Sequence, residues 1–358
     1  MPVYRFIRNH LIFSLILCFG LISLVFGILV FRNAAWGDWY YHTIFVPINA
    51  GLQSLMAFSP TPFYLVLLGV VFIIIIGGFL ALSGRPWKVI VLSVSLFTFS
   101  SLVLLISLFY WMWGYNYGRT TLTQSYFEGD FISIESEEFK RRWALQTNRV
   151  NTLREKVVLP EETDVFTEQY ASMYRKTAEK MPFFFELDTK LQPVCKNFIP
   201  AGMLLRLNTA GFYFPFGSES YVDKALHISQ KPAVIAHELA HGYGITDEGE
   251  ASFVGYLLCQ NSGDPLAMYS SALMLWLYMA GDGRKMDPDY AQSMWDNLSP
   301  EVWIDLDERR KLDEQFPEIM PQMRDAIYDS YLSMNKVEGG MKSYNRFVTM
   351  ILTHEQRK

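Results

Sequence analysis

The chain has 358 residues, of which 51% are hydrophobic and 19% are charged, and its formal net charge at pH 7 is −5. These values exclude a disordered or collagen-like chain, and three cysteines are too few for a disulfide framework. The first 118 residues contain one acid and five bases, whereas the other 240 contain 35 acids and 26 bases. We therefore expect a membrane region (1–118) and an acidic soluble domain (119–358). No nucleic acid partner is expected, because no basic run could neutralise phosphates.

Three uncharged segments of the first region are each long enough to cross about 30 Å of hydrocarbon, and they are Leu11–Phe31, Pro62–Leu82 and Val89–Trp113. A cleaved signal peptide is the alternative for the first segment. Its apolar stretch exceeds the usual 7 to about 15 residues, and two more spans follow. No span contains Lys, Arg, Asp or Glu, so the sequence predicts an anchor in the lipid bilayer and not an ion pathway.

The bases in the short loops predict the orientation of the spans. Arg5 and Arg8 precede the first span, and Arg85 and Lys88 lie between the second and third, whereas the first connection carries only Arg32. Because positive loops stay in the cytoplasm, the N-terminus is expected inside. Three crossings then place the soluble domain outside the cytoplasm.

The connection between the first two spans predicts a helix on the membrane surface over residues 34–60. It begins with Trp36, Trp39 and Tyr40, aromatic residues that favour the headgroup depth. Apolar residues then recur at near-helical spacing, as in an amphipathic helix lying in the interface.

The soluble region predicts several helices. Apolar residues recur on one stripe in Glu137–Val157 and in Val165–Lys180, and the charges between them are typical of a solvated face. Leu266–Ala280 is apolar, but it is shorter than a span and therefore predicts a core helix. The fold class expected is mainly helical α+β.

A β-hairpin is predicted between Thr209 and Ile228, with its turn at Gly217-Ser218. Pro215 usually confines a strand to a sheet edge, so the first strand is expected at the edge of a small sheet. Such an edge could bind an extended peptide by strand addition, or a loop could cover it. The candidate substrate-binding residues are Gly211, Phe212, Tyr213 and Phe214.

The chemistry is expected on the segment Lys231–His241, which predicts a short helix with Pro232 near its first position. His237 and His241 are four residues apart, so they project from one face and can share a Zn²⁺ at about 2.0–2.1 Å. Glu238 lies on the flank, where it would act as base on the water that the metal activates. Two purely structural histidines are the alternative, but they would flank a buried acid at a cost.

A catalytic zinc needs a third protein ligand. Thr246 can cap a second helix, and Glu250 would then lie on the same inward face as Phe253. This position makes Glu250 the candidate third ligand. Asp247 and Glu248 would point elsewhere on the first turn, where acids favour the helix dipole.

Two further questions remain open in the sequence. A donor that stabilises a transition-state oxyanion cannot be chosen among five candidates, namely Tyr213, His227, Tyr243, Tyr269 and Tyr344. Cys195 and Cys259 could pair in an oxidising compartment, or they could remain buried free thiols.

The sequence resembles a family of bacterial three-span membrane proteins that is found chiefly in the Bacteroidetes group and catalogued as a domain of unknown function. The members of this family resemble zinc metallopeptidases of the gluzincin type. The resemblance is carried by Trp113–Tyr117, Gly211–Phe216 with Glu219, His237–His241, Glu250–Phe253, Tyr256-Leu257, Tyr269-Ser270, Tyr328–Leu332, Gly340 and Ser343-Tyr344. It implies a gluzincin-like fold, a bacterial inner membrane location, and zinc held by His237, His241 and Glu250 with Glu238 as base.

The expected function is therefore hydrolysis of peptide bonds in a peptide or protein substrate by a membrane-anchored zinc metallopeptidase. The alternative is a non-catalytic receptor or assembly factor that keeps the zinc fold to bind peptides. The presence of Glu238 favours the enzyme, since a binding protein could dispense with a base.

Overall fold

The computed structural model describes residues 11–132, 134–159, 166–181, 187–319 and 346–357. These residues form two compact units. One unit ends at Thr120 and includes Pro215–Gly217, and the other comprises Thr121–Phe214 and the described residues from Ser218 onward. The motifs at Tyr328–Leu332, Gly340 and Ser343-Tyr344 lie outside the described residues.

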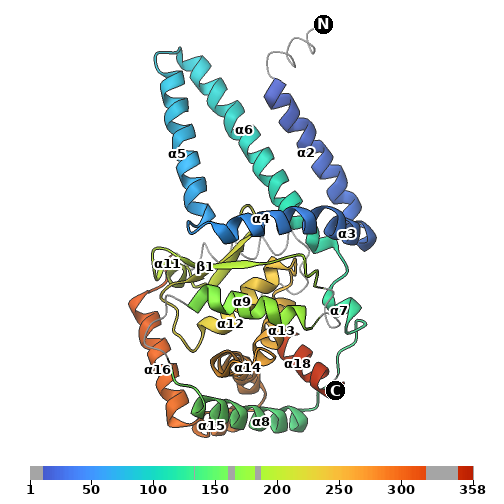
Figure 1. The fold of residues 1–358 in the computed structure, drawn as a ribbon, viewed down its shortest axis with the longest axis vertical. Coiled ribbons are helices and arrows are strands. Elements are labelled where there is room, and N and C mark those ends of the chain that lie inside the picture. Colours follow the sequence, from blue (N-terminus) through green and yellow to red (C-terminus); the bar gives the residue numbers. More distant parts are fainter. Residues whose placement is uncertain (1–10, 133, 160–165, 182–186, 320–345, 358) are drawn as a thin grey trace. The chain divides into compact units, whose positions relative to one another are not determined.

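The first unit contains three long apolar helices, α2 (Leu11–Val30), α5 (Phe63–Leu82) and α6 (Trp87–Met112) (Figure 1). Their mean hydropathy values are 2.8, 3.1 and 2.6, and each is long and apolar enough to cross a membrane. The bounds agree with the predicted spans to within two residues. By length and composition these helices are typical of a membrane protein.

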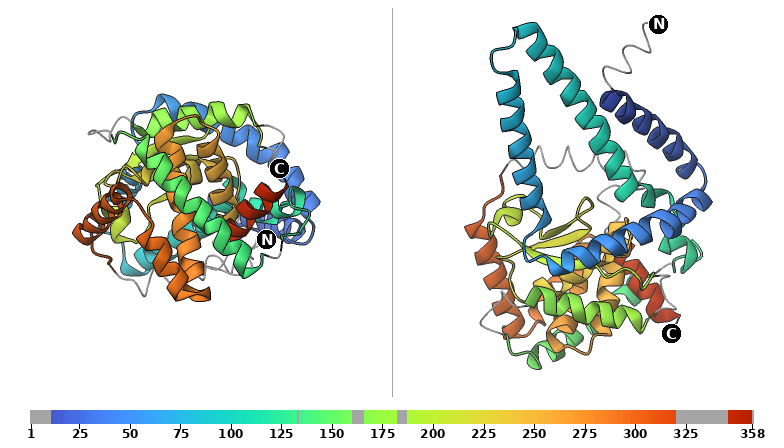
Figure 2. Two further views of the ribbon diagram at one scale, coloured as in Figure 1. Left: turned by 90° about the horizontal axis from the view of Figure 1, so that it is seen from below. Right: turned by 45° about the horizontal axis from the view of Figure 1, so that its top comes forward.

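A nearly continuous helical segment separates the first two of these helices. It consists of α3 (Ala34–Tyr40), a π-helical turn η1 (Tyr41–Phe45) and α4 (Val46–Phe58), and it runs crosswise to the long helices of its unit (Figures 1 and 2). Trp36, Trp39 and Phe58 are exposed, while Tyr41 and Phe45 are buried. The helical prediction over 34–60 is confirmed, and its depth in a membrane stays a prediction.

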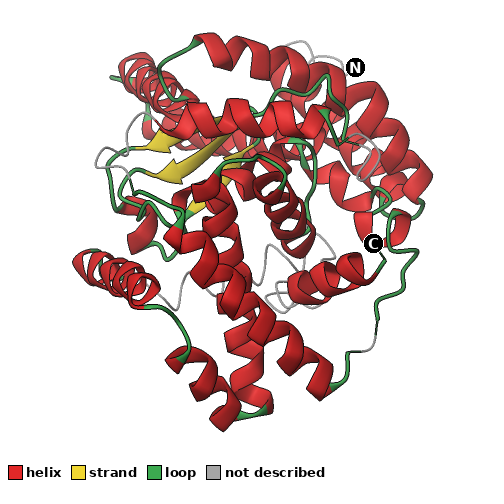
Figure 3. Cartoon of the chain, turned by 60° about the horizontal axis from the view of Figure 1, so that its bottom comes forward, coloured by secondary structure: helices red, strands yellow, loops and turns green. Residues whose placement is uncertain are grey.

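The second unit contains a three-stranded sheet among its described residues, formed by β1 (Val194–Phe198), β2 (Gly211–Phe214) and β3 (Glu219–Asp223) (Figure 3). The order is β1-β3-β2, so the predicted hairpin is confirmed with β2 at an edge. β2 ends just before Pro215, which has no N–H to donate to a ladder. The parallel pairing of β1 with β3 has no counterpart in the sequence-based prediction.

Three helices pack together beside the sheet, α12 (Lys231–Gly242), α13 (Glu248–Gln260) and α14 (Pro265–Met286). α12 contacts all three strands. Ser220 of β3 donates a hydrogen bond to the backbone carbonyl of Glu238 (2.7 Å), and Ser270 of α14 accepts one from the N–H of Ala233 (3.1 Å). These bonds fix α12 between the sheet and α14, which is a core helix as predicted.

The backbones of α12 and α13 approach each other closely at Gly255. A Cβ atom at this position would lie 2.9 Å from the backbone nitrogen of His237, a distance that real Cβ atoms essentially never show. The glycine therefore permits a helix contact that any other residue would push apart.

The remaining helices of the second unit surround this core: α7 (Leu122–Ser125), α8 (Ser136–Glu155), α9 (Phe166–Glu179), α11 (Met203–Arg206), α15 (Pro288–Asp296), α16 (Pro300–Gln315) and α18 (Arg346–Gln356). The predicted helices at 137–157 and 165–180 correspond to α8 and α9. Val165 itself lies outside the described residues. An ion pair joins the partly buried Arg154 of α8 to the buried Asp305 of α16 (2.6 Å).

Candidate metal centre

Two helix ends bring the candidate ligands together. His237 and His241 lie on consecutive turns of α12, and their imidazole rings are 4.8 Å apart between centroids. α13 begins only six residues after α12 ends, and its first turn faces the same histidines. Asp247 caps α13 by accepting a hydrogen bond from the N–H of Glu250 (3.0 Å). The predicted cap, Thr246, is therefore wrong by one residue.

The structure brings one carboxylate against the two imidazoles, and it is that of Glu248. His237 Nε2 lies 3.2 Å from His241 Nε2, and Glu248 Oε2 lies 3.1 Å from the first nitrogen and 3.5 Å from the second. Donors at about 2.0–2.1 Å from a tetrahedral Zn²⁺ are separated from each other by about 3.3–3.4 Å. The three donor atoms therefore fit one such ion.

The other nitrogen of each imidazole is held by α13 or by the loop before it. His241 Nδ1 donates to the backbone carbonyl of Ile245 (2.7 Å), and His237 Nδ1 lies 3.1 Å from Ser252 Oγ. A ring whose Nδ1 carries the proton presents the lone pair of Nε2 when it is neutral. Such contacts orient metal-binding histidines in general, because they fix both the tautomer and the ring plane.

Glu238 is buried on the flank of α12 beside β2. Its side chain is 5% exposed, and among the described residues its Oε2 has no hydrogen-bond partner. A Cβ at Gly211 would lie 2.9 Å from Oε1, so the carboxylate abuts the backbone of the edge strand. Burial raises the pKa of this carboxyl to about 7, although the charges of His237 and His241 oppose the shift.

The electrostatics of the cluster favour a cation. Burial alone would lower the pKa of His241, but the facing carboxylates of Glu248 and Glu238 outweigh it and raise this pKa to about 9. Burial opposes the ionisation of Glu248, yet the charges of His241 and His237 hold its pKa well below the usual value. With neutral imidazoles and both carboxylates ionised, the cluster carries two negative charges, which one divalent ion would neutralise.

Glu250, the third ligand chosen from the sequence, lies elsewhere. Its Oε1 accepts hydrogen bonds from the N–H and the hydroxyl of Thr123 (both 2.7 Å), and its Oε2 accepts one from the N–H of Leu122 (3.1 Å). Glu248 occupies the place expected of Glu250, which corrects the earlier choice. Glu250 was chosen because it faces inward with Phe253. Eleven of the thirteen residues of α13 are buried, so an inward position does not identify the residue that meets the histidines.

The candidate substrate-binding strand and the candidate oxyanion donors are only partly brought to this centre. Gly211 of β2 abuts Glu238, whereas Tyr213 bonds to Ser218 (3.1 Å). Tyr269 donates to Asp305 (2.6 Å), and His227 lies 3.1 Å from Glu308. Tyr243 is buried at the end of α12, and Tyr344 lies outside the described residues.

Tyr278 of α14 escaped the sequence-based prediction. Burial, and then the charge of Glu248, raise the pKa of its hydroxyl to about 12, so it lies in the electrostatic field of the candidate ligand. No motif marks this residue. Only the packing of α14 against α12 and α13 brings it to the site.

The two cysteines of the second unit are buried free thiols. Cys195 is in β1, and Cys259 is in α13 with its sulfur 3.2 Å from the Tyr174 hydroxyl. The alternative without a disulfide is therefore the one observed.

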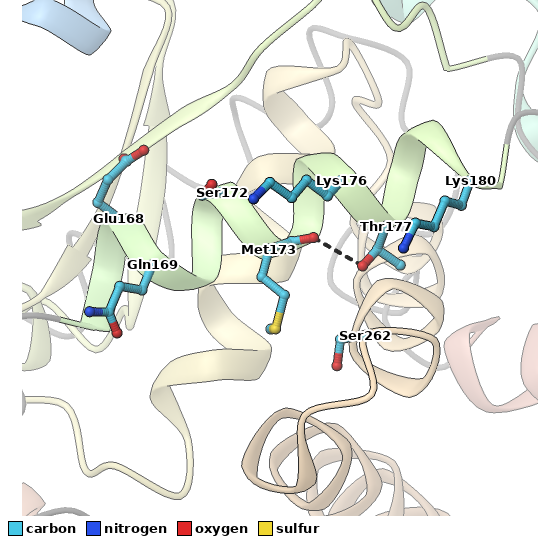
Figure 4. Close-up of a pocket in the computed structure, with 8 residues that line it drawn as sticks. All are labelled: Glu168, Gln169, Ser172, Met173, Lys176, Thr177, Lys180 and Ser262. Carbon is cyan, nitrogen blue, oxygen red and sulfur yellow. Dashed lines mark hydrogen bonds between the residues drawn. The ribbon is translucent and has the colours of Figure 1, made fainter.

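An open groove runs along α9 (Figure 4). Its lining residues are Glu168, Gln169, Ser172, Met173, Lys176, Thr177, Lys180 and Ser262. None of the residues of the candidate metal centre is among them, so the groove is a separate feature of the second unit.

The close approach of Tyr221 and Glu238 to Gly211 predicts that a larger residue at this position lowers stability. A Cβ there would lie 2.7 Å from the carbonyl oxygen of Tyr221 and 2.9 Å from Glu238, so Gly211→Ala is expected to lower the free energy of unfolding by about 1–3 kcal/mol. Denaturant titration of the full chain in detergent measures this. Gly281→Ala on α14 is the matched control, because a Cβ there meets nothing within 4 Å and should be neutral or stabilising. Equal effects of the two substitutions would contradict the prediction.

Three membrane-type helices, a mainly helical unit with a small sheet, and a cluster of two histidines and one glutamate define a membrane protein with a candidate metal centre. The sequence matches the family described as "Protein of unknown function (DUF3810)" over residues 40–352, and the chain belongs to this family. The match includes every residue of the candidate centre. No curated protein and no solved structure matches the chain.

Proposed function

We propose that this protein is a membrane-anchored, zinc-dependent metallopeptidase of the gluzincin type that hydrolyses peptide bonds. The observation that carries the proposal is the set of three donor atoms, His237 Nε2, His241 Nε2 and Glu248 Oε2, at mutual distances of 3.1–3.5 Å. These distances are compatible with a single zinc ion, and both imidazoles direct the same nitrogen to one point.

The residues present fit the metal and the reaction. His237, His241 and Glu248 would hold the ion and leave a fourth position open. A bound Zn²⁺ supplies a Lewis acid that lowers the pKa of water and polarises a carbonyl group. Glu238 accepts the proton of the attacking water on Oε2, which has no hydrogen-bond partner in the described part of the chain, and returns it to the leaving amine. Burial raises the pKa of this carboxyl to about 7 in the metal-free chain, and a bound divalent cation would lower it and favour the carboxylate that a base requires.

The edge strand β2 is the proposed place for the substrate backbone. β2 is an edge strand of the described sheet, and its first residue, Gly211, abuts Glu238. A peptide added as a further strand would gain main-chain hydrogen bonds and lie beside the base. The substrate class is therefore an extended peptide or an unfolded segment of a protein.

A receptor or assembly factor that binds peptides without cleaving them is the rival. The carboxylate of Glu238 argues against it, because a buried acid with one oxygen lacking a hydrogen-bond partner among the described residues costs stability, and binding alone does not require it. The proposed location is a bacterial inner membrane, with the N-terminus in the cytoplasm and the second unit outside it, as the loop charges favour.

The proposal is tested by the metal content and the activity of the full chain purified in detergent. We expect one zinc per chain by elemental analysis, and turnover of a library of extended peptides that stops when a chelator removes the zinc. His237→Ala should lose both properties, whereas His227→Ala, whose ring contacts Ser229 and Glu308, should keep them. A wild-type chain without zinc would refute the centre, and zinc without turnover would favour the receptor.

A further inference from the structure

Glu250 completes the hydrogen bonding of a short helix that is distant in sequence. α7 begins at Leu122 with Thr121 as its cap, and the Thr121 hydroxyl accepts from the N–H of Gln124 (3.2 Å). The first two N–H groups of α7, those of Leu122 and Thr123, donate to the carboxylate of Glu250 instead. All three N–H groups at the start of α7 thus have acceptors, and the one on the buried Leu122 could not be satisfied by water.

The same contact immobilises the first turn of α13. Asp247, the residue before Glu248, caps this turn and forms an ion pair with Arg346. Glu250, two residues after Glu248, is hydrogen-bonded to α7. The side chain of Glu248 therefore projects from a stretch of backbone that is held on both sides. Its carboxylate has to reach the point shared by two imidazoles to within a fraction of an ångström, and such precision depends on the groups behind a ligand.

We propose that Glu250 and Thr123 form a positioning pair for the metal centre. The pair holds the first turn of α13 so that Glu248 meets His237 and His241, and the zinc affinity of the centre depends on it. This inference rests on the proposed function. Its consequence is that α7, the first helix of the chain after residue 120, sets the strength of metal binding without contacting the metal.

A purely structural pair would act differently from a positioning pair. Loss of a structural contact lowers the stability of the whole unit and affects zinc binding whether or not Glu248 is intact. Loss of a positioning contact acts through Glu248, so it has no further effect once Glu248 is a poor ligand. A double-mutant cycle separates the two roles.

The experiment measures the zinc dissociation constant of the full chain in detergent by competition with a chromogenic chelator. Thr123→Val removes the hydroxyl and keeps the shape, and it should weaken zinc binding about tenfold at one zinc per chain. Thr123→Ser keeps the hydroxyl and should stay within about twofold of the wild type. In a Glu248→Gln background, which retains a weaker oxygen ligand, Thr123→Val should add no loss.

A second measurement guards against a variant that folds poorly. The difference in melting temperature between zinc-loaded and zinc-free chain should shrink in Thr123→Val and in Glu250→Gln. Zinc affinity unchanged by Thr123→Val, or an equal loss in the Glu248→Gln background, overturns the positioning role and leaves the proposed function intact. A wild-type chain that binds no zinc overturns both.

Discussion

Glu238→Gln is expected to lower the rate of peptide hydrolysis by about 100- to 10,000-fold while the chain keeps one zinc. Gln has nearly the same shape, so it fits the space beside Gly211, but its amide cannot accept the proton of an attacking water. His237, His241 and Glu248 are unchanged, so metal binding should remain. The measurement is the initial rate on a cleaved peptide, together with elemental analysis of the same preparation.

Glu137→Gln serves as the control for this substitution, because Glu137 lies on the exposed face of α8 and its side chain is 85% exposed. It should leave the rate unchanged. A Glu238→Gln variant that retains zinc and cleaves within tenfold of the wild-type rate would remove Glu238 from the role of base. The zinc site itself would survive that result.

Glu248→Gln is expected to weaken zinc binding on the order of 100-fold, and Glu250→Gln only about tenfold. The first substitution replaces a charged oxygen 3.1 Å from His237 Nε2 by a neutral one. The second keeps all three ligand side chains and weakens the bonds to Leu122 and Thr123, which hold the first turn of α13 in position. Chelator competition on the two variants, prepared in parallel, measures both constants.

The order of the two losses decides which acid is the third ligand. A larger loss in Glu250→Gln than in Glu248→Gln would restore the assignment made from the sequence. The two positions are a matched pair, since both acids lie in the first turn of α13 and both substitutions remove one charge. Unfolding measured without zinc corrects for any difference in stability between the variants.

Features that depend on local pattern could be predicted from the sequence. The three apolar helices follow from uninterrupted runs of uncharged residues, and α12 follows from the proline near its first position. The hairpin follows from Gly217-Ser218 between two strand-like segments. Each of these signals is contained within about 20 neighbouring residues, so no knowledge of tertiary packing is needed.

Features that depend on distant contacts could not be predicted in this way. The choice between Glu248 and Glu250 depends on where α7 docks, and Thr123 is 127 residues from Glu250 in the chain. The parallel pairing of β1 with β3 and the approach of Tyr278 to Glu248 likewise join segments without a local signal. Side-chain direction on a helix that is buried almost all round has no periodic signature.

Under the proposed function, the glycine contact between α12 and α13 limits how a substrate could enter. Because the two backbones are in contact at Gly255, α12 and α13, which carry the candidate ligands, are packed together as one rigid unit. Parting them to admit a peptide would pull Glu248 away from His237. If the proposed hydrolysis is correct, a peptide would therefore reach Glu238 from the side of β2, where Gly211 abuts the carboxylate, and the ligand geometry would stay unchanged.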